Sequence, residues 1–209
     1  MNYILNVLEV NIYSMINKQV FKDTLFIIIE LAGDTGIGAV KLNKCLIIID
    51  ALHKALYGET LTGATYIKHR FGPVPGTEAY NLIKETIASG DIEVFDEMVS
   101  PGFYEKNHYL HPEIKAPLDS FSDEEIELIS WTVSTVMSMT AQQISEISHD
   151  KCYHSTPMFQ EIDLDNIFVW KVIDEQTDKY SFERGVSEIN FDELNNIIQR
   201  KQAAVNSAF

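Results

Sequence analysis

The sequence predicts an α+β fold: a mainly α-helical domain with a small antiparallel β-hairpin or sheet. Two observations support this prediction. Several segments repeat apolar residues at the three- and four-residue spacing of a buried helix face. Around residues 92–110 the pattern changes to short apolar and aromatic runs on either side of a Ser-Pro-Gly turn, which is typical of a hairpin. At 209 residues the chain is long enough for one core with extensions.

The first predicted helix covers residues 18–31. Its apolar positions are Val20, Phe21, Leu25, Phe26, Ile28 and Ile29. A glycine-rich segment, residues 33–38, follows the helix. It lacks the Gly-Lys-Ser/Thr ending of a phosphate-binding loop, and the segment before it is helical, so we interpret it as a structural turn.

The central helix is the most strongly patterned segment, and it begins at Val40. Its apolar face consists of Leu42, Cys45, Leu46, Ile49, Leu52 and Leu56. Gly58 follows Tyr57 at a position where a left-handed residue would end the helix. Residues 64–71 have a β-branched and aromatic character, and Gly72, Pro73, Val74 and Pro75 then fix two φ angles and remove two backbone donors. We expect this loop to be stiff without being regular.

The remaining elements follow from local signals. Pro75 is a suitable first residue for a helix that runs to Ser89, and the hairpin strands are expected at residues 92–95 and 103–110. Capping boxes at Ser122 and Thr140 predict helices that reach Met139 and Ser148. We divide the chain into an N-terminal extension (1–17), a domain (18–165) and a C-terminal extension (166–209) with a closing helix at residues 191–204.

The charge balance disfavours several classes of function. The chain has 16 basic and 31 acidic residues, a net charge of −15, which argues against a protein whose main role is to bind the phosphate backbone of nucleic acid. Residues 113–209 hold 7 basic and 18 acidic residues; this acidity either maintains solubility or attracts a basic partner. Two cysteines indicate no disulfide framework and a reducing cytoplasm, and neither a signal peptide nor a membrane span is expected.

Catalytic and metal sites receive little support from the sequence. His149, Cys152 and His154 lie within six residues, but no fourth ligand stands at a supporting distance, so we expect no metal and no cofactor. No Gly-x-Ser-x-Gly elbow is present, and Cys45 lies on an apolar helix face. We expect no enzyme and no catalytic residue. One alternative stays open, a hydrolase-like enzyme that uses Asp50, His53 and His149, provided that these side chains converge in one cleft.

The basic residues of the first half are concentrated around the central helix. They are Lys41, Lys44, Lys54, Lys68 and Arg70. Such residues are commonly solvated and paired with nearby carboxylates. Together with the stiff loop they would instead form a patch for a partner, because a fixed loop with aromatic and arginine side chains loses little entropy on docking.

The same stretch carries a resemblance to a known family. The order KLNKxLxxxDxxHxxxxGxxxTGxxYxKxxFGPVP, from Lys41 to Pro75, resembles the domain of the bacterial antitoxin SocA, also called the Panacea domain. Weaker similarity occurs at residues 90–92 and 144–149, so the resemblance covers residues 20–165. The sequence departs from the family pattern at Tyr153, where an aromatic residue, often tryptophan, is expected, and it continues beyond the family's usual end.

The resemblance implies an antitoxin-like, protein-binding domain associated with phages or mobile elements. Such a domain neutralises a cognate toxin by direct binding or as a proteolytic adaptor. The implied partners are a toxin encoded by a neighbouring gene, which the acidity of the chain suggests is basic, and a protease or its unfoldase. A DNA-binding regulator is a further alternative, which the net charge disfavours.

The resemblance and the basic patch together suggest which residues act. We expect partner contacts at Lys41, Lys44, Tyr66, Arg70 and Phe71. Gly72, Pro73, Val74 and Pro75 would hold the loop, and Ser148 with His149 would tie the later helix to it.

Overall fold

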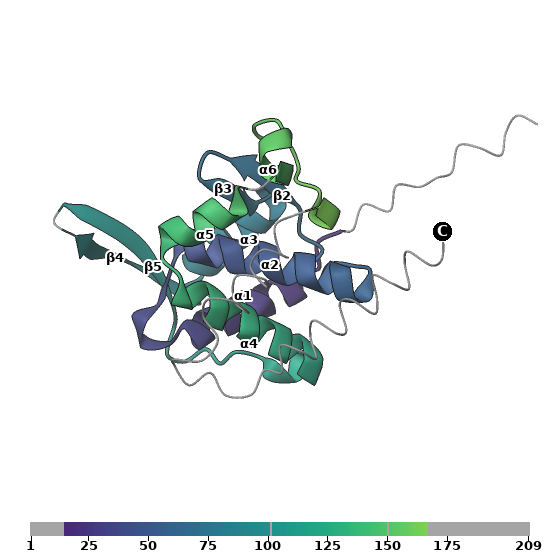
Figure 1. Ribbon diagram of the computed structural model, residues 1–209. Coiled ribbons are helices and arrows are strands. Elements are labelled where there is room, and N and C mark those ends of the chain that lie inside the picture. Colours follow the sequence, from purple (N-terminus) through teal and green to yellow (C-terminus); the bar gives the residue numbers. More distant parts are fainter. Residues whose placement is uncertain (1–14, 101, 150, 167–209) are drawn as a thin grey trace, which may run out of the picture.

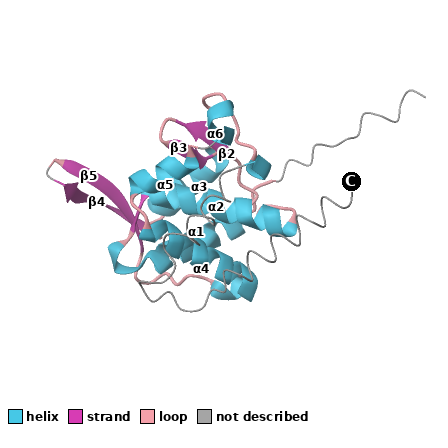
Figure 2. Cartoon of the chain, in the orientation of Figure 1, coloured by secondary structure: helices cyan, strands magenta, loops and turns pink. Residues whose placement is uncertain are grey.

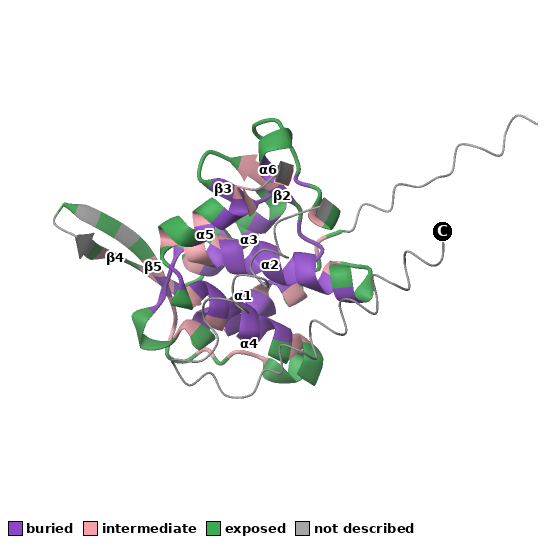
Figure 3. Ribbon diagram, in the orientation of Figure 1, coloured by how far each residue is buried: buried purple, intermediate pink, exposed green. Residues whose placement is uncertain are grey.

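The central helix α2 (Ala39–Tyr57) runs through the middle of the molecule, and the other elements surround it (Figure 1). The computed structural model describes residues 15–100, 102–149 and 151–166. Most of α2 is buried, which Figure 3 shows as a nearly continuous purple helix. The helix ends at Gly58, whose left-handed conformation (φ 87°) lets its N–H donate to the Lys54 carbonyl.

The described residues contain five further helices. They are α1 (Lys18–Ala32), α3 (Thr77–Ala88), α4 (Asp123–Ser138), α5 (Ala141–Ser148) and α6 (Lys151–Ser155). Of these, α1, α4 and α5 pack directly against α2. The core between α1, α2 and α4 contains Phe21, Leu46 and Trp131, all at most 1% exposed. Short 3-10 turns occur at Gly33–Thr35, Leu118–Ser120 and Leu164–Asn166. Within the described residues, no helix is both long and apolar enough to cross a bilayer.

Both predicted capping boxes are confirmed. Ser122 accepts from the Glu125 N–H, and the Glu125 carboxylate accepts from the Ser122 N–H. Thr140 and Gln143 make the same reciprocal pair at α5. These bonds satisfy N–H groups that have no partner within the helix, so both helices begin close to the predicted residues.

Two small antiparallel sheets complete the fold and confirm the α+β class (Figure 2). The first has the strand order β1-β5-β4, from β1 (Ile37–Gly38), β5 (Phe103–Leu110) and β4 (Ile92–Ser100). The second is the hairpin of β2 (Tyr66–His69) and β3 (Gly72–Pro75). Strands β4 and β5 extend away from the helices as a projecting arm.

The structure corrects several details of the sequence prediction. The Gly72–Pro75 segment is a regular strand rather than an irregular loop, because it pairs residue by residue with β2. Consequently Pro75 lies opposite Tyr66, and α3 begins two residues later, after Gly76. Strand β4 is longer than predicted, while β1 and α6 were not predicted. The proposed closing helix at residues 191–204 lies outside the described residues.

Candidate functional site

The buried carboxylate of Asp50 joins α2 to the loop that follows it. Thr62 donates to this carboxylate from its backbone N–H (2.8 Å) and from its hydroxyl (2.5 Å), and the Tyr66 hydroxyl donates a third bond (2.6 Å). Burial raises the pKa of Asp50, while the three hydrogen bonds act in the opposite direction. Strand β2 begins at Tyr66, so these bonds fix the start of the hairpin against the helix.

Lys44 makes a second buried polar contact, earlier on α2. Its side chain is 1% exposed, and its Nζ donates to the Pro73 carbonyl (3.4 Å). Gly72 leaves room for this amine: a Cβ at position 72 would lie 2.2 Å from Lys44 Nζ and 2.9 Å from Ser148 Oγ. Burial lowers the pKa of Lys44 to about 7. The amine therefore marks the point at which α2, β3 and α5 meet.

Tyr153 of α6 holds the turn of the hairpin from the other side. Its hydroxyl donates to the His69 carbonyl (2.7 Å), and the Arg70 carbonyl is 3.3 Å away. The ammonium of Lys68 lies 4.5 Å from the centre of its ring, a cation–π distance. The backbone of the β2–β3 turn is thus fixed by a side chain more than eighty residues later in the sequence.

His149 links Tyr153 to the buried lysine. The two rings are stacked, with centroids 4.2 Å apart and planes 9° from parallel. Burial and, secondly, the charge of Lys44 lower the pKa of His149. Its buried Nε2 has no hydrogen-bond partner among the described residues. The imidazole therefore favours the neutral form, which suits a packing role between α5 and α6.

The turn of this fixed hairpin and the segment beside it present a cation and two aromatic rings to solvent. Phe71 is 64% exposed, and the Arg70 guanidinium carbon lies 5.4 Å from its ring centre. Phe159 is 65% exposed and meets the ring of His69 edge to face at 5.9 Å. We name these four residues, His69, Arg70, Phe71 and Phe159, the hairpin tip. A rigid backbone with exposed aromatic and arginine side chains is suited to protein recognition.

The five predicted contact residues occupy different environments. Arg70 and Phe71 are exposed at the hairpin tip. Lys44 and Tyr66 are buried: Lys44 donates to the Pro73 carbonyl, and Tyr66 donates to the Asp50 carboxylate. Lys41 is half-buried, and its Nζ donates to the Met137 carbonyl near the end of α4 (3.3 Å). Of these five residues, a partner that docks on the surface of this conformation can therefore contact Arg70, Phe71 and part of Lys41.

The predicted loop and tie residues lie close together at the junction described above. Gly72 and Pro73 are in contact with Lys44, and Ser148 lies beside Gly72. Val74 and Pro75 pair with Ile67 and Tyr66 across the hairpin. The sequence did not indicate that Lys44 fills the space between the hairpin and α5. The available signal was weak: a lysine within an apolar helical pattern, and a glycine, Gly72, later in the chain.

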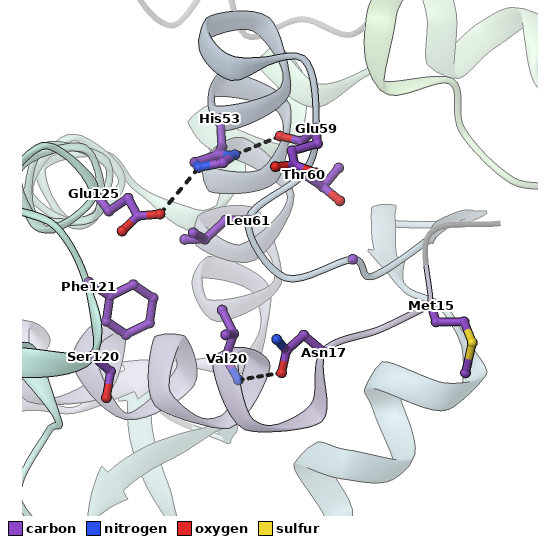
Figure 4. A pocket seen from close by; sticks show the side chains of 11 residues that line it. Met15, Asn17, Val20, His53, Glu59, Thr60, Leu61, Ser120, Phe121 and Glu125 are labelled. Atoms are coloured by element: carbon purple, nitrogen blue, oxygen red, sulfur yellow. Dashed lines mark hydrogen bonds and ion pairs between the residues drawn. The ribbon is translucent and has the colours of Figure 1, made fainter. Parts of the chain in front are cut away.

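The alternative catalytic group does not assemble in the described structure. His53 lines a hollow of about 330 Å³ (Figure 4), whose lining includes neither Asp50 nor His149. There His53 Nδ1 is 2.6 Å from the Glu59 carbonyl and Nε2 is 3.5 Å from the Glu125 carboxylate. His149 packs against α6 instead. Asp50 and His53 are both buried, so neither presents an acid-base group on the surface of α2.

Metal binding finds no support in the described part of the chain. No group of three or more His, Cys, Asp or Glu side chains there is arranged to hold an ion. His149 and His154, two of the residues considered above, have ring centres 6.4 Å apart. Their rings pack with Tyr153, which is the arrangement of an aromatic cluster.

Sequence reasoning missed two contributors to this region. Phe159 joins the hairpin tip because residues 159–162 run alongside β2, where the Phe159 N–H donates to the Lys68 carbonyl (3.0 Å). In the sequence, Tyr153 stands only as a substitute for the aromatic residue that the family pattern has at this position. Neither residue has a local sequence signal for its role, since both roles depend on contacts across long sequence separations.

Comparison with known proteins gives one finding. The family model described as "Antitoxin SocA-like, Panacea domain" matches residues 42–154, more than half of the chain. The matched region includes Lys44, the hairpin, α5 and most of α6. Searches of curated proteins and of solved structures gave no significant match.

Proposed function

Because the chain belongs to the SocA-like antitoxin family with a Panacea domain, we propose that it neutralises a cognate toxin by binding it directly. Binding would either block the toxin or deliver it to a protease, with the chain acting as an adaptor. The toxin is encoded by a neighbouring gene on a phage or mobile element, and both proteins act in the cytoplasm. No chemical step by this chain is needed for such a role.

The observation that supports this proposal best is the fixed hairpin tip. Hydrogen bonds from Lys44 and Tyr153 hold the backbone on both sides of the turn, while Arg70 and Phe71 remain exposed. A side chain on a pre-ordered backbone loses little conformational entropy when a partner covers it, so aromatic and arginine residues there become strong anchors. We therefore place the main toxin contact at Arg70 and Phe71, with Lys41 at its margin.

Co-purification tests this proposal. The tagged chain would be expressed with the product of each adjacent gene, and one product is expected to be retained. The double variant Arg70→Glu, Phe71→Ala is expected to reduce retention by at least about ten-fold, since two anchor contacts are lost. Both side chains are exposed, so the variant should fold normally.

A matched control exists on α3. Lys84 and Tyr80 form another exposed cation–π pair, with 4.4 Å from the ammonium to the ring centre. The variant Lys84→Glu, Tyr80→Ala makes the same chemical change away from the hairpin tip and should retain the toxin. Equal losses in both variants would contradict the proposed contact, and retention of no adjacent product would contradict toxin binding itself.

A further inference from the structure

The projecting arm, residues 92–110, carries a second surface, which is acidic, whereas the hairpin tip carries the cation of Arg70. Its base is fixed to the body: the Tyr109 ring packs on Gly36, and His108 Nδ1 lies 3.1 Å from the Ile37 carbonyl. Ile92 and Val94 pack toward the core. The rest of the arm extends into solvent (Figures 1 and 2). The arm is therefore an anchored projection and not part of the core.

One face of the arm combines carboxylates with an exposed ring. Residues at alternate positions share a face of a strand, so Glu93, Phe95 and Glu97 lie on the side opposite Ile92 and Val94. Phe95 is 51% exposed, and its ring centre lies 5.7 Å from that of Tyr109. We name these three residues of β4, together with Asn107 and Tyr109 of β5, the outer face.

The carboxylate of Glu97 is already oriented. Asn107 Nδ2 donates to its Oε2 (2.8 Å), and the Tyr109 hydroxyl hydrogen-bonds to its Oε1. The hydrogen bond to Glu97 is the main reason that the pKa of Tyr109 is raised. A carboxylate has about four acceptor positions, so Glu97 can still accept from an incoming cation. Its orientation lowers the entropy that such a contact would cost.

The arm also offers open strand edges. In the described structure β4 is at the end of its sheet, and β1 pairs with β5 only at Asn107 and His108. Edge strands present backbone N–H and C=O groups that an extended peptide can pair with. Side chains of an added strand would recur on one face about every 7 Å, the same spacing as Glu93, Phe95 and Glu97.

We propose that the outer face of the arm binds an extended segment of a protein partner that carries arginine at alternate positions. Residues 92–110 include four acidic residues and one lysine, so this charge complements a basic segment and repels nucleic acid. A second copy of the chain would place carboxylates against carboxylates. Arginine fits better than lysine, because its planar guanidinium can bind Glu97 in a bidentate manner and stack on Phe95. In the toxin-neutralising role the segment belongs to the toxin, and in that respect the inference rests on the proposed function.

A peptide titration with the full chain tests this inference. The probe is a fluorescent nine-residue peptide in which arginine alternates with threonine; the comparison peptide has the same composition with its arginines consecutive. The alternating peptide is expected to bind more tightly. The double variant Glu93→Gln, Glu97→Gln is expected to weaken its binding by about ten-fold, and Phe95→Ser should weaken it with every carboxylate retained.

Non-specific attraction to an acidic protein is controlled by a second double variant. Asp96→Asn, Glu113→Gln removes the same number of charges, but Asp96 faces the other side of the arm, where its carboxylate lies 3.3 Å from Lys106 Nζ. This variant should bind the peptide like the wild type. Equal weakening in both double variants, unchanged binding in Phe95→Ser, or equal affinity for the two peptides would each overturn the inference. None of these results depends on a toxin, so they are separate from a failure of co-purification.

Discussion

Two ionisable side chains of α2, Asp50 and Lys44, are buried against the segment that forms the β2–β3 hairpin. Asp50 accepts three hydrogen bonds, whereas Lys44 has one long bond to a carbonyl among the described residues. A buried charge without a compensating partner shifts its pKa toward the neutral form. The two residues therefore contribute differently to stability: Asp50 fixes the loop through its donors, and Lys44 fills space beside Gly72.

The buried amine of Lys44 predicts a specific pH dependence of stability. Its pKa is about 7 in the folded chain and near 10.5 when exposed, so between these values the unfolded state binds more protons. The free energy of unfolding should therefore rise with pH in this window, by up to about 1.4 kcal/mol per pH unit. Below pH 7 both states are protonated, and the full cost of burying the charge applies.

Urea unfolding of the wild type and of Lys44→Met at pH 6, 8 and 10 measures this contribution. Methionine has a similar length and no charge, so the variant lacks the dependence. Relative to the variant, the wild type should be least stable at pH 6 and should gain stability toward pH 10. A difference that does not change with pH would contradict the lowered pKa of Lys44 and therefore the burial of its amine.

The hydrogen bond from Tyr66 to Asp50 predicts a measurable loss on its removal. Tyr66→Phe takes one donor from a buried carboxylate and should lower the free energy of unfolding by about 2 kcal/mol. Tyr80→Phe is the control, because Tyr80 is half exposed on α3 and should change stability by less than about 0.5 kcal/mol. Thermal and urea unfolding of both variants provide the comparison, and equal losses would contradict a special role for the Asp50 cluster.

At the scale of elements, the β2–β3 hairpin depends on Gly72 for two separate reasons. Gly72 has φ of 105°, and it leaves room for Lys44 Nζ. Gly58 shares only the first property, since nothing lies within 4 Å of the position of its absent Cβ. Gly58→Ala should therefore cost about 1 kcal/mol, the penalty of a positive φ, whereas Gly72→Ala should cost more, because the buried Lys44 amine must also shift.

Unfolding measurements on the two glycine variants separate conformational strain from the steric clash. In the Lys44→Ala background the extra cost at position 72 should shrink, because the closer of the two contacts, with the Lys44 amine, is gone. Equal costs for Gly58→Ala and Gly72→Ala in the wild type would contradict the close contact between the hairpin and α2.

The helices could be predicted from the sequence more completely than the strands. The long helices have apolar faces of many residues, and α4 and α5 carry their caps within four residues, so local pattern was sufficient. Strand β3 contains Pro73 and Pro75, which argue against a strand. It forms because β2 holds it on one side, while Lys44 reaches the Pro73 carbonyl. Two-residue β1 has no period of its own and depends on β5.

At the scale of the whole molecule, the charge is distributed unevenly. The chain has a net charge of −15, yet the hairpin tip presents Arg70 with aromatic residues, and the arm presents carboxylates. Figure 1 shows the hairpin and the arm projecting in different directions from the α2 core. The sequence located the first region through its basic residues. It did not indicate the outer face, because the predicted strand ended at residue 95, whereas β4 continues to Ser100 and brings Glu97 to Asn107 and Tyr109 of β5.

Growth rescue tests the central claim most directly. Each adjacent gene would be induced in a host cell together with the wild-type chain, with Arg70→Glu, Phe71→Ala, or with Lys84→Glu, Tyr80→Ala. We predict that one adjacent gene stops growth, that the wild type and the α3 variant restore it, and that the hairpin-tip variant does not, although it accumulates to the same level. Restoration by the hairpin-tip variant would contradict the assignment of the contact, and absence of rescue for every toxic neighbour would contradict toxin neutralisation.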